Sequence, residues 1–178
     1  MNIFAVDPNP ILAARMLPDK HIVKMPLETA QMLSIVCSDW YRGWGSLPKK
    51  DGSVYATERG AFRNHPCTVW AAENDSHLLW LILHGHALCE EYTYRFKKIH
   101  SCAAAIRKAG EYLGRSSLSY LSWNPRPDHF ARAMPDDLRN DTSISDVEAY
   151  RRYLNTKKWV AGNYRRVPER RPDWIVTD

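Results

Sequence analysis

Four polar side chains that could do acid–base chemistry recur within a largely apolar stretch near the start of the chain. They are His21, Lys24, Glu28 and Gln31, spaced by three, four and three residues. On an α-helix of about 3.6 residues per turn, this spacing puts all four on one face. A carboxylate and an amine lying among apolar side chains can have their pKa values tuned for proton transfer. The alternative is an ordinary polar face with a surface ion pair between Lys24 and Glu28.

A proline, Pro26, lies inside this predicted helix, two residues before Glu28. It removes the hydrogen bond back to Ile22 and tends to kink the helix axis. We therefore expect a distorted backbone beside the polar stripe. The helix is predicted to begin after an N-cap at Asp19 and to end near Trp40.

The rest of the chain predicts further helices separated by irregular segments. Helices are expected over residues 11–17, 67–73, from 77 onward, 102–110 and about 146–160. Gly and Pro residues mark a long irregular loop at 41–65, and residues 114–143 are irregular as well. The expected fold is mainly α, a single-domain bundle of about four to six helices spanning residues 1–178, with irregular basic C-terminal segments.

Composition limits the possible classes of protein. The chain has 178 residues, enough for one core, and a net charge of +5, which permits a polyanionic partner. No apolar run approaches the roughly 18 residues of a membrane helix, and residues 1–4 do not begin a signal peptide. The four cysteines are widely spaced and form no C-x-x-C pair, which is typical of free thiols in a reducing cytoplasm. We expect no metal site and no cofactor.

Basic and aromatic residues interleave in the loop at 41–65 and in the C-terminal tail. This pattern suits contacts to phosphates combined with stacking on bases, although a plain solvated loop and tail would have the same composition. In the tail the residues concerned are Lys157, Lys158, Trp159, Tyr164, Arg165, Arg166, Arg170, Arg171 and Trp174.

Three polar residues of the helix that starts near residue 77 also share a face. His84, Glu91 and Arg95 are spaced by seven and four residues. Because the helix becomes more polar toward its end, we expect these charges on its solvent side as it leaves the core.

The stretch from Lys20 to Leu33 resembles the catalytic region of the pyrimidine-dimer DNA glycosylases, the phage endonuclease V type, and most of all its bacterial branch. In that branch the pattern is Lys-Arg-Leu-x-Lys-Gln-x-Val-Glu-Ala-Leu-Gln-x-Leu. It coincides here at Lys20, Lys24, Glu28, Gln31 and Leu33, with His21 in place of an Arg. The start Met1-Asn2-x-Phe4, and His65-Pro66 followed by Trp70, are also similar to the family. The resemblance covers about residues 1–95.

The resemblance implies an all-helical enzyme that acts on damaged duplex DNA in a bacterial or phage-infected cell. In this family the N-terminal α-amine attacks the deoxyribose C1′ as the base leaves, and the resulting Schiff base leads to strand cleavage by β-elimination. An α-amine titrates near about 8 and a lysine near about 10.4, so the α-amine is the better nucleophile at neutral pH. We expect catalytic roles for Glu28, Met1, Lys24 and His21. We expect substrate contacts from Asn2, Lys20, Gln31, His65, Trp70 and Arg95.

One departure from the family concerns the nucleophile. The phage enzymes lose their initiator Met before a small residue, whereas Asn2 is a poor context for that removal. If Met1 stays, its own amine, Lys20 or Lys24 must act, or the Schiff-base chemistry is lost. Two alternatives then stand beside the glycosylase: a transferase that modifies a DNA base or nucleotide, and a nucleic-acid-binding or partner-binding protein without catalysis.

Overall fold

Helices form almost all of the regular structure of this protein. The computed structural model describes residues 1–114 and 125–177, and within these ranges it has no β-strand. The helices are α1 (Pro10–Arg15), α2 (Asp19–Cys37), α3 (Pro66–Glu73), α4 (Asp75–Phe96), α5 (Ala103–Tyr112), α6 (Asp136–Arg139), α7 (Asp146–Asn155) and the short 3₁₀ helix η2 (Pro168–Arg170). The mainly α fold is confirmed. The described α-helices outnumber the expected four to six because very short helices such as α6 were not foreseen. Part of the irregular segment expected at 114–143, residues 115–124, lies outside the described residues.

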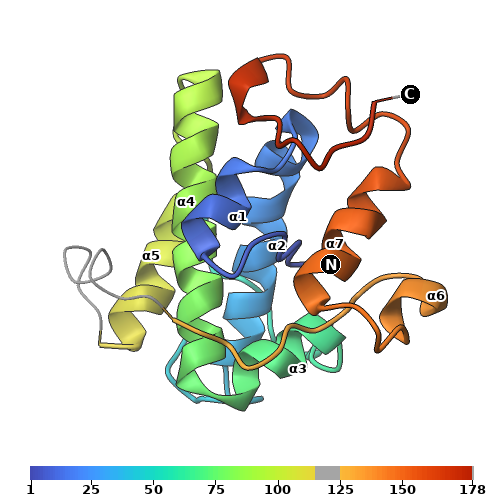
Figure 1. Ribbon diagram of the computed structural model, residues 1–178. Helices are drawn as coiled ribbons and strands as arrows, with labels where there is room; N and C mark the ends of the chain where they lie inside the picture. Colours follow the sequence, from blue (N-terminus) through green and yellow to red (C-terminus); the bar gives the residue numbers. More distant parts are fainter. Residues whose placement is uncertain (115–124, 178) are drawn as a thin grey trace.

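The two long helices, α2 and α4, form the centre of the molecule (Figure 1). Helix α4 contacts α1, α2, α3 and α5, and α2 also contacts α3 and α5. Helix α7 lies on the other side of α2 from α5, and the N-terminus lies beside α7 (Figure 1). One hydrophobic cluster of the described residues extends from Ile3 to Ile175. Both chain ends therefore pack against the central pair of helices.

The N-terminal segment is buried in this core. Ile3, Ala5 and Val6 are at most 1% exposed. Helix α4 holds the residues that follow: the Trp80 indole donates to the Pro8 carbonyl at 2.7 Å, and His84 Nδ1 lies 3.0 Å from the Pro10 carbonyl oxygen. The first residues of the chain are thus as firmly placed as the helices around them.

Several of these helices begin after a residue of a type that favours the N-cap position. Asn9 caps α1, with Pro10 in the first turn, and Asn74 caps α4. Asp19, however, is not the N-cap of α2, because Pro18 takes that position and α2 ends at Cys37. The Asp19 carboxylate instead accepts hydrogen bonds from the Arg95 guanidinium and from the backbone N–H of Arg166. The helix contains Pro26 within its continuous span.

The solvent-facing position expected for His84, Glu91 and Arg95 is wrong. These residues are 1%, 5% and 4% exposed. Arg95 donates to Glu91 at 3.0 Å, to Asp19 at 3.2 Å and to the Leu17 carbonyl at 2.8 Å. Their partners come from the chain in and around α1 and α2 and from the C-terminal segment. The sequence pattern of α4 alone does not show that these segments cover this face of the helix, so it predicted a solvent-exposed face.

Two expectations concerned the cysteines and the possibility of a membrane-spanning helix. Cys37, Cys67, Cys89 and Cys102 are all free and buried, as expected. Among the described helices, none combines the length and apolar character that crossing a lipid bilayer requires.

A candidate active site at the N-terminus

A pocket of about 410 Å³ opens where the N-terminal segment, α2 and the chain around α7 meet. We call it the Glu28 pocket. It is lined by Met1, Asn2, Phe4, Lys20, His21, Lys24, Met25, Glu28, Ala133, Tyr153, Lys157 and Trp159. Three of the four residues of the predicted polar stripe, His21, Lys24 and Glu28, therefore line a pocket that Met1 also lines.

Glu28 lies in the pocket wall with its side chain only 10% exposed. Its partner is Lys24, one helical turn earlier, with Nζ 2.9 Å from Oε1. The Lys24 side chain is 68% exposed, so it reaches the carboxylate from the solvent side. The ion pair of the simpler interpretation is thus present, but one of its partners is buried in a pocket rather than on an open face.

The side chain of Asn2 makes three hydrogen bonds at the start of the chain. The Asn2 side-chain oxygen accepts from the N–H groups of Ile3 and Phe4 at 2.8 and 3.0 Å. Its amide nitrogen donates to the Ala133 carbonyl at 2.7 Å. Phe4 has a φ of +43°, an uncommon conformation for a bulky residue that marks local strain. Asn2 therefore acts on the backbone at the start of the chain, which it holds in a sharp bend.

Two side chains next to the pocket carry the electrostatic influence of both Met1 and Glu28. Burial lowers the pKa of His65; the Met1 amine lowers it further, while Glu28 and a hydrogen bond to the Met1 backbone raise it. Burial raises the pKa of the Cys67 thiol to about 12, an effect that the Met1 amine opposes and Glu28 reinforces. The amine and the carboxylate thus act in opposite directions on the pKa values of the same two groups.

An aromatic wall completes the pocket, and we define it as Phe4, His21, Tyr153 and Trp159. The His21 ring stacks on Phe4 with centroids 4.2 Å apart and meets the edge of Trp159 at 5.5 Å. Tyr153 lies parallel to Phe4 at 5.9 Å. Two lysine amines cap these rings: Lys20 over Trp159 at 4.7 Å, and Lys157 over Tyr153 at 4.1 Å.

His21 is neutral at physiological pH. Burial lowers its pKa to about 3, and the charges of Lys157 and Lys24 contribute in the same direction. Its Nδ1 is buried and has no hydrogen-bond partner among the described residues. The imidazole is therefore an aromatic surface at neutral pH and not a proton donor.

The structure brings together most of the residues predicted from the sequence. Met1, Asn2, Lys20, His21, Lys24 and Glu28 all line the Glu28 pocket. His65 adjoins it through Met1. Trp70 and Arg95 do not reach it: Trp70 is 1% exposed and donates to the His129 carbonyl, and Arg95 lies in the buried ion-pair cluster.

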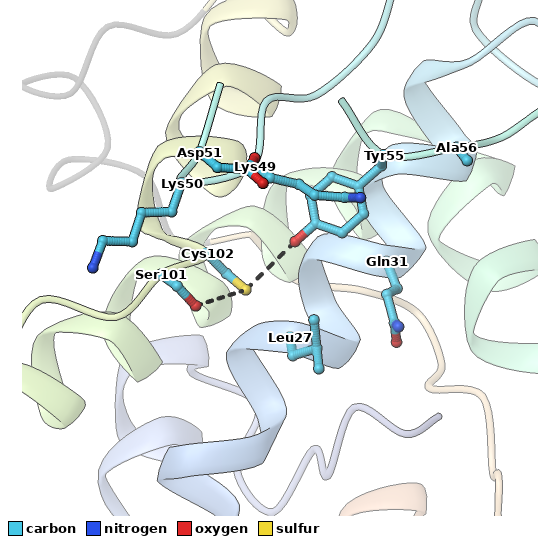
Figure 2. Close-up of a pocket in the computed structure, with 9 residues that line it drawn as sticks. All are labelled: Leu27, Gln31, Lys49, Lys50, Asp51, Tyr55, Ala56, Ser101 and Cys102. Carbon is cyan, nitrogen blue, oxygen red and sulfur yellow. Dashed lines mark hydrogen bonds between the residues drawn. The ribbon is translucent and has the colours of Figure 1, made fainter. Parts of the chain in front are cut away.

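Gln31 belongs to a second pocket of about 670 Å³, which we call the Tyr55 pocket (Figure 2). Gln31 and Leu27 come from α2, and Tyr55 comes from the loop at 41–65. Figure 2 shows the Tyr55 hydroxyl directed at Cys102, whose Sγ lies 3.5 Å away. The long loop thus builds a binding surface on one side of α2, separate from the Glu28 pocket.

Several residues of the Glu28 pocket were not singled out from the sequence. Lys157 and Trp159 were visible only as part of the basic and aromatic tail, and Phe4 only as part of the resemblance at the start of the chain. Ala133 and Tyr153 gave no signal, because they reach the pocket from distant parts of the chain.

The chemistry of the pocket suits a nucleotide. It combines a carboxylate, an amine-bearing chain terminus, aromatic rings on which a base can stack and three lysines that can contact phosphates. The described residues contain one group of three side chains with metal-ligand geometry, and that group lies elsewhere, at Glu73, His77 and His129.

Comparison with known proteins identifies the family. The sequence model of the family described as pyrimidine dimer DNA glycosylase matches residues 1–104. Comparisons with curated proteins and with solved structures gave no match. The matched range covers more than half of the 178 residues and includes Met1, Lys24, Glu28 and His65. The chain belongs to the pyrimidine dimer DNA glycosylase family.

Proposed function

We propose that the protein removes a damaged or modified pyrimidine from duplex DNA and then cleaves the strand, with the Met1 α-amine as nucleophile and Glu28 as the proton-transfer group. Membership of the family makes the protein a DNA-repair enzyme of the glycosylase type, with DNA as its class of substrate. The observation that carries the finer proposal is that Met1 and Glu28 line one pocket, at a chain terminus that is fixed in place.

The proposed reaction begins with attack of the Met1 nitrogen on the deoxyribose C1′. The C1′–N bond to the base breaks, and the base leaves with the electron pair and takes up a proton. Next, the bond between C1′ and O4′ breaks, O4′ gains a proton and the nitrogen loses one, which gives a Schiff base. Removal of a proton from C2′ then expels the 3′ phosphate. Glu28 is suited to exchange these protons because it is a carboxylate that lines the same pocket as Met1.

The remaining residues of the pocket have supporting roles in this proposal. Lys20, Lys24 and Lys157 contact phosphates beside the lesion, since their amines lie at the rim of the pocket. The aromatic wall, neutral because His21 is uncharged, accepts the base after it leaves the stack.

One observation favours a second candidate function, transfer of a group to a DNA base or nucleotide. Such a transferase needs a site for the donor, and the Tyr55 pocket is a second cavity that shares helix α2 with the Glu28 pocket. In this version Glu28 activates the acceptor and no covalent bond to the protein forms.

Borohydride trapping on duplex DNA with an abasic site tests the proposal, because borohydride reduces a Schiff base to a stable adduct. We expect an adduct with the wild-type protein and none with a protein whose N-terminus is blocked by acetylation. Glu28→Gln should lower the rate of adduct formation by about a hundredfold or more while it keeps DNA binding. The matched control is Glu90→Gln, a change of an exposed glutamate on α4 outside the Glu28 pocket.

The other outcomes separate the alternatives. An adduct that survives N-terminal blocking would transfer the nucleophile role to a lysine, and Lys20→Ala and Lys24→Ala would show which one. The absence of any adduct from wild-type protein that still binds DNA would overturn the glycosylase mechanism and favour the transferase.

A further inference from the structure

Outside both pockets, two imidazoles and two carboxylates form a closed ring. Glu73 is the last residue of α3, His77 lies in the first turn of α4, and Asp128 and His129 belong to the segment before α6. Each histidine contacts both carboxylates, one with each ring nitrogen. None of these residues lines the Glu28 pocket or the Tyr55 pocket.

The Asp128 carboxylate orients both imidazole rings. Its Oδ1 lies 2.7 Å from His77 Nε2 and 3.1 Å from His129 Nδ1. A carboxylate oxygen accepts hydrogen bonds, so these contacts favour hydrogen on both of the nitrogens that face it, as in the carboxylate–histidine pairs that support metal sites.

The other nitrogens of the two rings converge on Glu73. His77 Nδ1 lies 3.2 Å and His129 Nε2 lies 3.4 Å from the same oxygen, Glu73 Oε2. The three donor atoms lie within 4.8 Å of one another. The Trp70 carbonyl oxygen is a fourth acceptor, 2.9 Å from His77 Nδ1. All four of these atoms, the two ring nitrogens and the two oxygens, carry lone pairs that repel one another at these distances. A cation, or protons on the two nitrogens, compensates this repulsion.

We propose that Glu73, His77 and His129 bind a divalent transition-metal cation of the zinc class. Two imidazole nitrogens and one carboxylate oxygen at bond lengths of about 2.0–2.2 Å stand about 3.3 Å apart around tetrahedral zinc. The two distances from the histidine nitrogens to Glu73 Oε2, 3.2 and 3.4 Å, are close to this value. His77 is 1% exposed, whereas the side chains of Glu73 and His129 are 41% and 49% exposed, so a cation can enter from solvent. Water completes the coordination.

The cation would fasten the segment before α6 to the junction of α3 and α4. The Trp70 indole holds the same segment through the His129 carbonyl at 2.7 Å. Four residues later the carbonyl of Ala133 accepts the hydrogen bond of Asn2, which positions the start of the chain. The site is thus structural, and it supports the wall of the Glu28 pocket without contributing to the reaction.

Metal analysis of the untagged protein tests this proposal. After incubation with Zn²⁺ and removal of unbound metal, we expect about one equivalent bound per chain. In a hundredfold excess of Zn²⁺ over Kd, Tm should rise by about 5–10 °C relative to protein in EDTA. Co²⁺ should give the visible absorption of a tetrahedral site. Glu73→Gln and His129→Ala, both at partly exposed positions, should each lose the bound metal and the Tm shift, and the control Asp137→Asn should keep both.

Two results would overturn the metal site. One is binding of Zn²⁺ by His129→Ala and Glu73→Gln as tightly as by wild type, which would put the metal elsewhere. The other is the absence of bound metal from wild-type protein after incubation with Zn²⁺. A Tm that then falls in wild type, and not in His129→Ala, as the pH rises from 5 to 8 would show that protons hold the ring together. Neither readout depends on the catalytic reaction.

Discussion

Glu28 and His21 share one face of α2, yet their surroundings give them different chemistry. Glu28 has the amine of Lys24 at 2.9 Å, which compensates the charge of the carboxylate. His21 is buried near two lysines, and this lowers its pKa to about 3. In the proposed reaction the carboxylate exchanges protons with the substrate, whereas the imidazole, whose pKa burial holds far below neutral, offers its ring. On this proposal the same helical face supplies one reactive group and one binding surface.

His21→Phe tests this division at the level of one residue. Phenylalanine keeps a ring to stack on Phe4 and removes the buried Nδ1 that lacks a partner. We expect the rate of strand cleavage to stay within about threefold of wild type and the free energy of unfolding to stay equal or rise by about 1 kcal/mol. The pH dependence of kcat/KM between 5 and 9 should not change. A lost limb in that profile would mean that His21 transfers a proton, and His21→Ala measures the contribution of the ring itself.

At this scale, the sequence predicted the polar stripe but not its surroundings. The spacing of His21, Lys24 and Glu28 is a local property of one helix, so it could be read from the sequence. Tyr153 and Ala133 could not be found in this way, because their place in the pocket depends on how α7 and the segment before α6 pack against α2. The contact of Trp159 with His21, and the charge of Lys157 that helps to lower the pKa of His21, likewise come from the end of the chain.

Close contact between α2, α4 and α5 depends on one residue without a side chain. A Cβ atom at Gly85 of α4 would lie 2.7 Å from Cγ2 of Thr29 on α2 and 3.1 Å from Cγ2 of Ile106 on α5. Contacts shorter than 3.0 Å are not tolerated between carbon atoms in a packed core. Because α2 carries Glu28, the packing at Gly85 also bears on the position of the helix that lines the Glu28 pocket.

Gly85→Ala should lower the free energy of unfolding by about 1–3 kcal/mol, as overpacked cores do. Gly162→Ala is the control, since a Cβ there meets nothing within 4 Å. Thr29→Ser removes the nearest methyl group, so the double variant should recover part of the loss. Urea denaturation of wild type, Gly85→Ala, Gly162→Ala, Thr29→Ser and the double variant Gly85→Ala/Thr29→Ser provides the comparison. Equal stability of Gly85→Ala and Gly162→Ala would show that the helices can separate without cost.

Helices and caps were the most predictable elements. Asn9, Asn74 and Ser145 cap helices, and Asn and Ser are among the residue types that favour the N-cap position. The environment of Arg95 was not predictable, because its partners Asp19 and Leu17 lie more than 70 residues away in the chain. A periodic pattern gives the face of a helix but not what packs on that face.

At the scale of the whole molecule, burial of histidines makes stability depend on pH. Burial lowers the pKa of His84 to about 4, and backbone hydrogen bonds at Pro10 and Ile3 only partly oppose this. Between pH 6.5 and 4, the histidine in the unfolded chain, with a pKa near 6.5, therefore binds a proton that His84 in the folded protein does not bind. Stability is fully present above pH 6.5 and falls as the pH drops from 6.5 toward 4. His21 contributes with the same sign down to about pH 3.

We expect the free energy of unfolding to fall by on the order of 3 kcal/mol for His84 alone between pH 6.5 and 4. His84→Gln keeps a donor for the Pro10 carbonyl and removes the titration, so its stability should decline less over the same range. Urea unfolding at a series of pH values measures both slopes. Parallel curves for the two proteins would contradict the assignment of this effect to His84.

The Glu28 pocket is assembled from two parts of the chain. Met1, Lys24 and Glu28 lie within the residues that match the family, whereas Ala133, Tyr153, Lys157 and Trp159 lie beyond residue 104. The groups proposed for bond breaking thus belong to the shared part. Part of the aromatic and cationic surface that would meet the base and its phosphates, namely Tyr153, Lys157 and Trp159, belongs to the remainder. Recognition of the lesion and cleavage of the sugar should therefore be separable by mutation.

Trp159→Ala is the change that separates them. Trp159 is 36% exposed at the pocket, with the Lys20 amine 4.7 Å from its ring centroid, and stacking of a base on such a ring contributes about 1–3 kcal/mol. We expect release of a damaged pyrimidine to slow by about ten- to a hundredfold, and cleavage at a preformed abasic site to change by less than about threefold, because no base remains to stack. Trp40→Ala, at an exposed tryptophan that does not line this pocket, should change neither rate. Equal losses on the two DNA substrates would show that Trp159 supports the catalytic residues instead of the base, and recognition would then have to lie in the part of the chain that contains Met1 and Glu28.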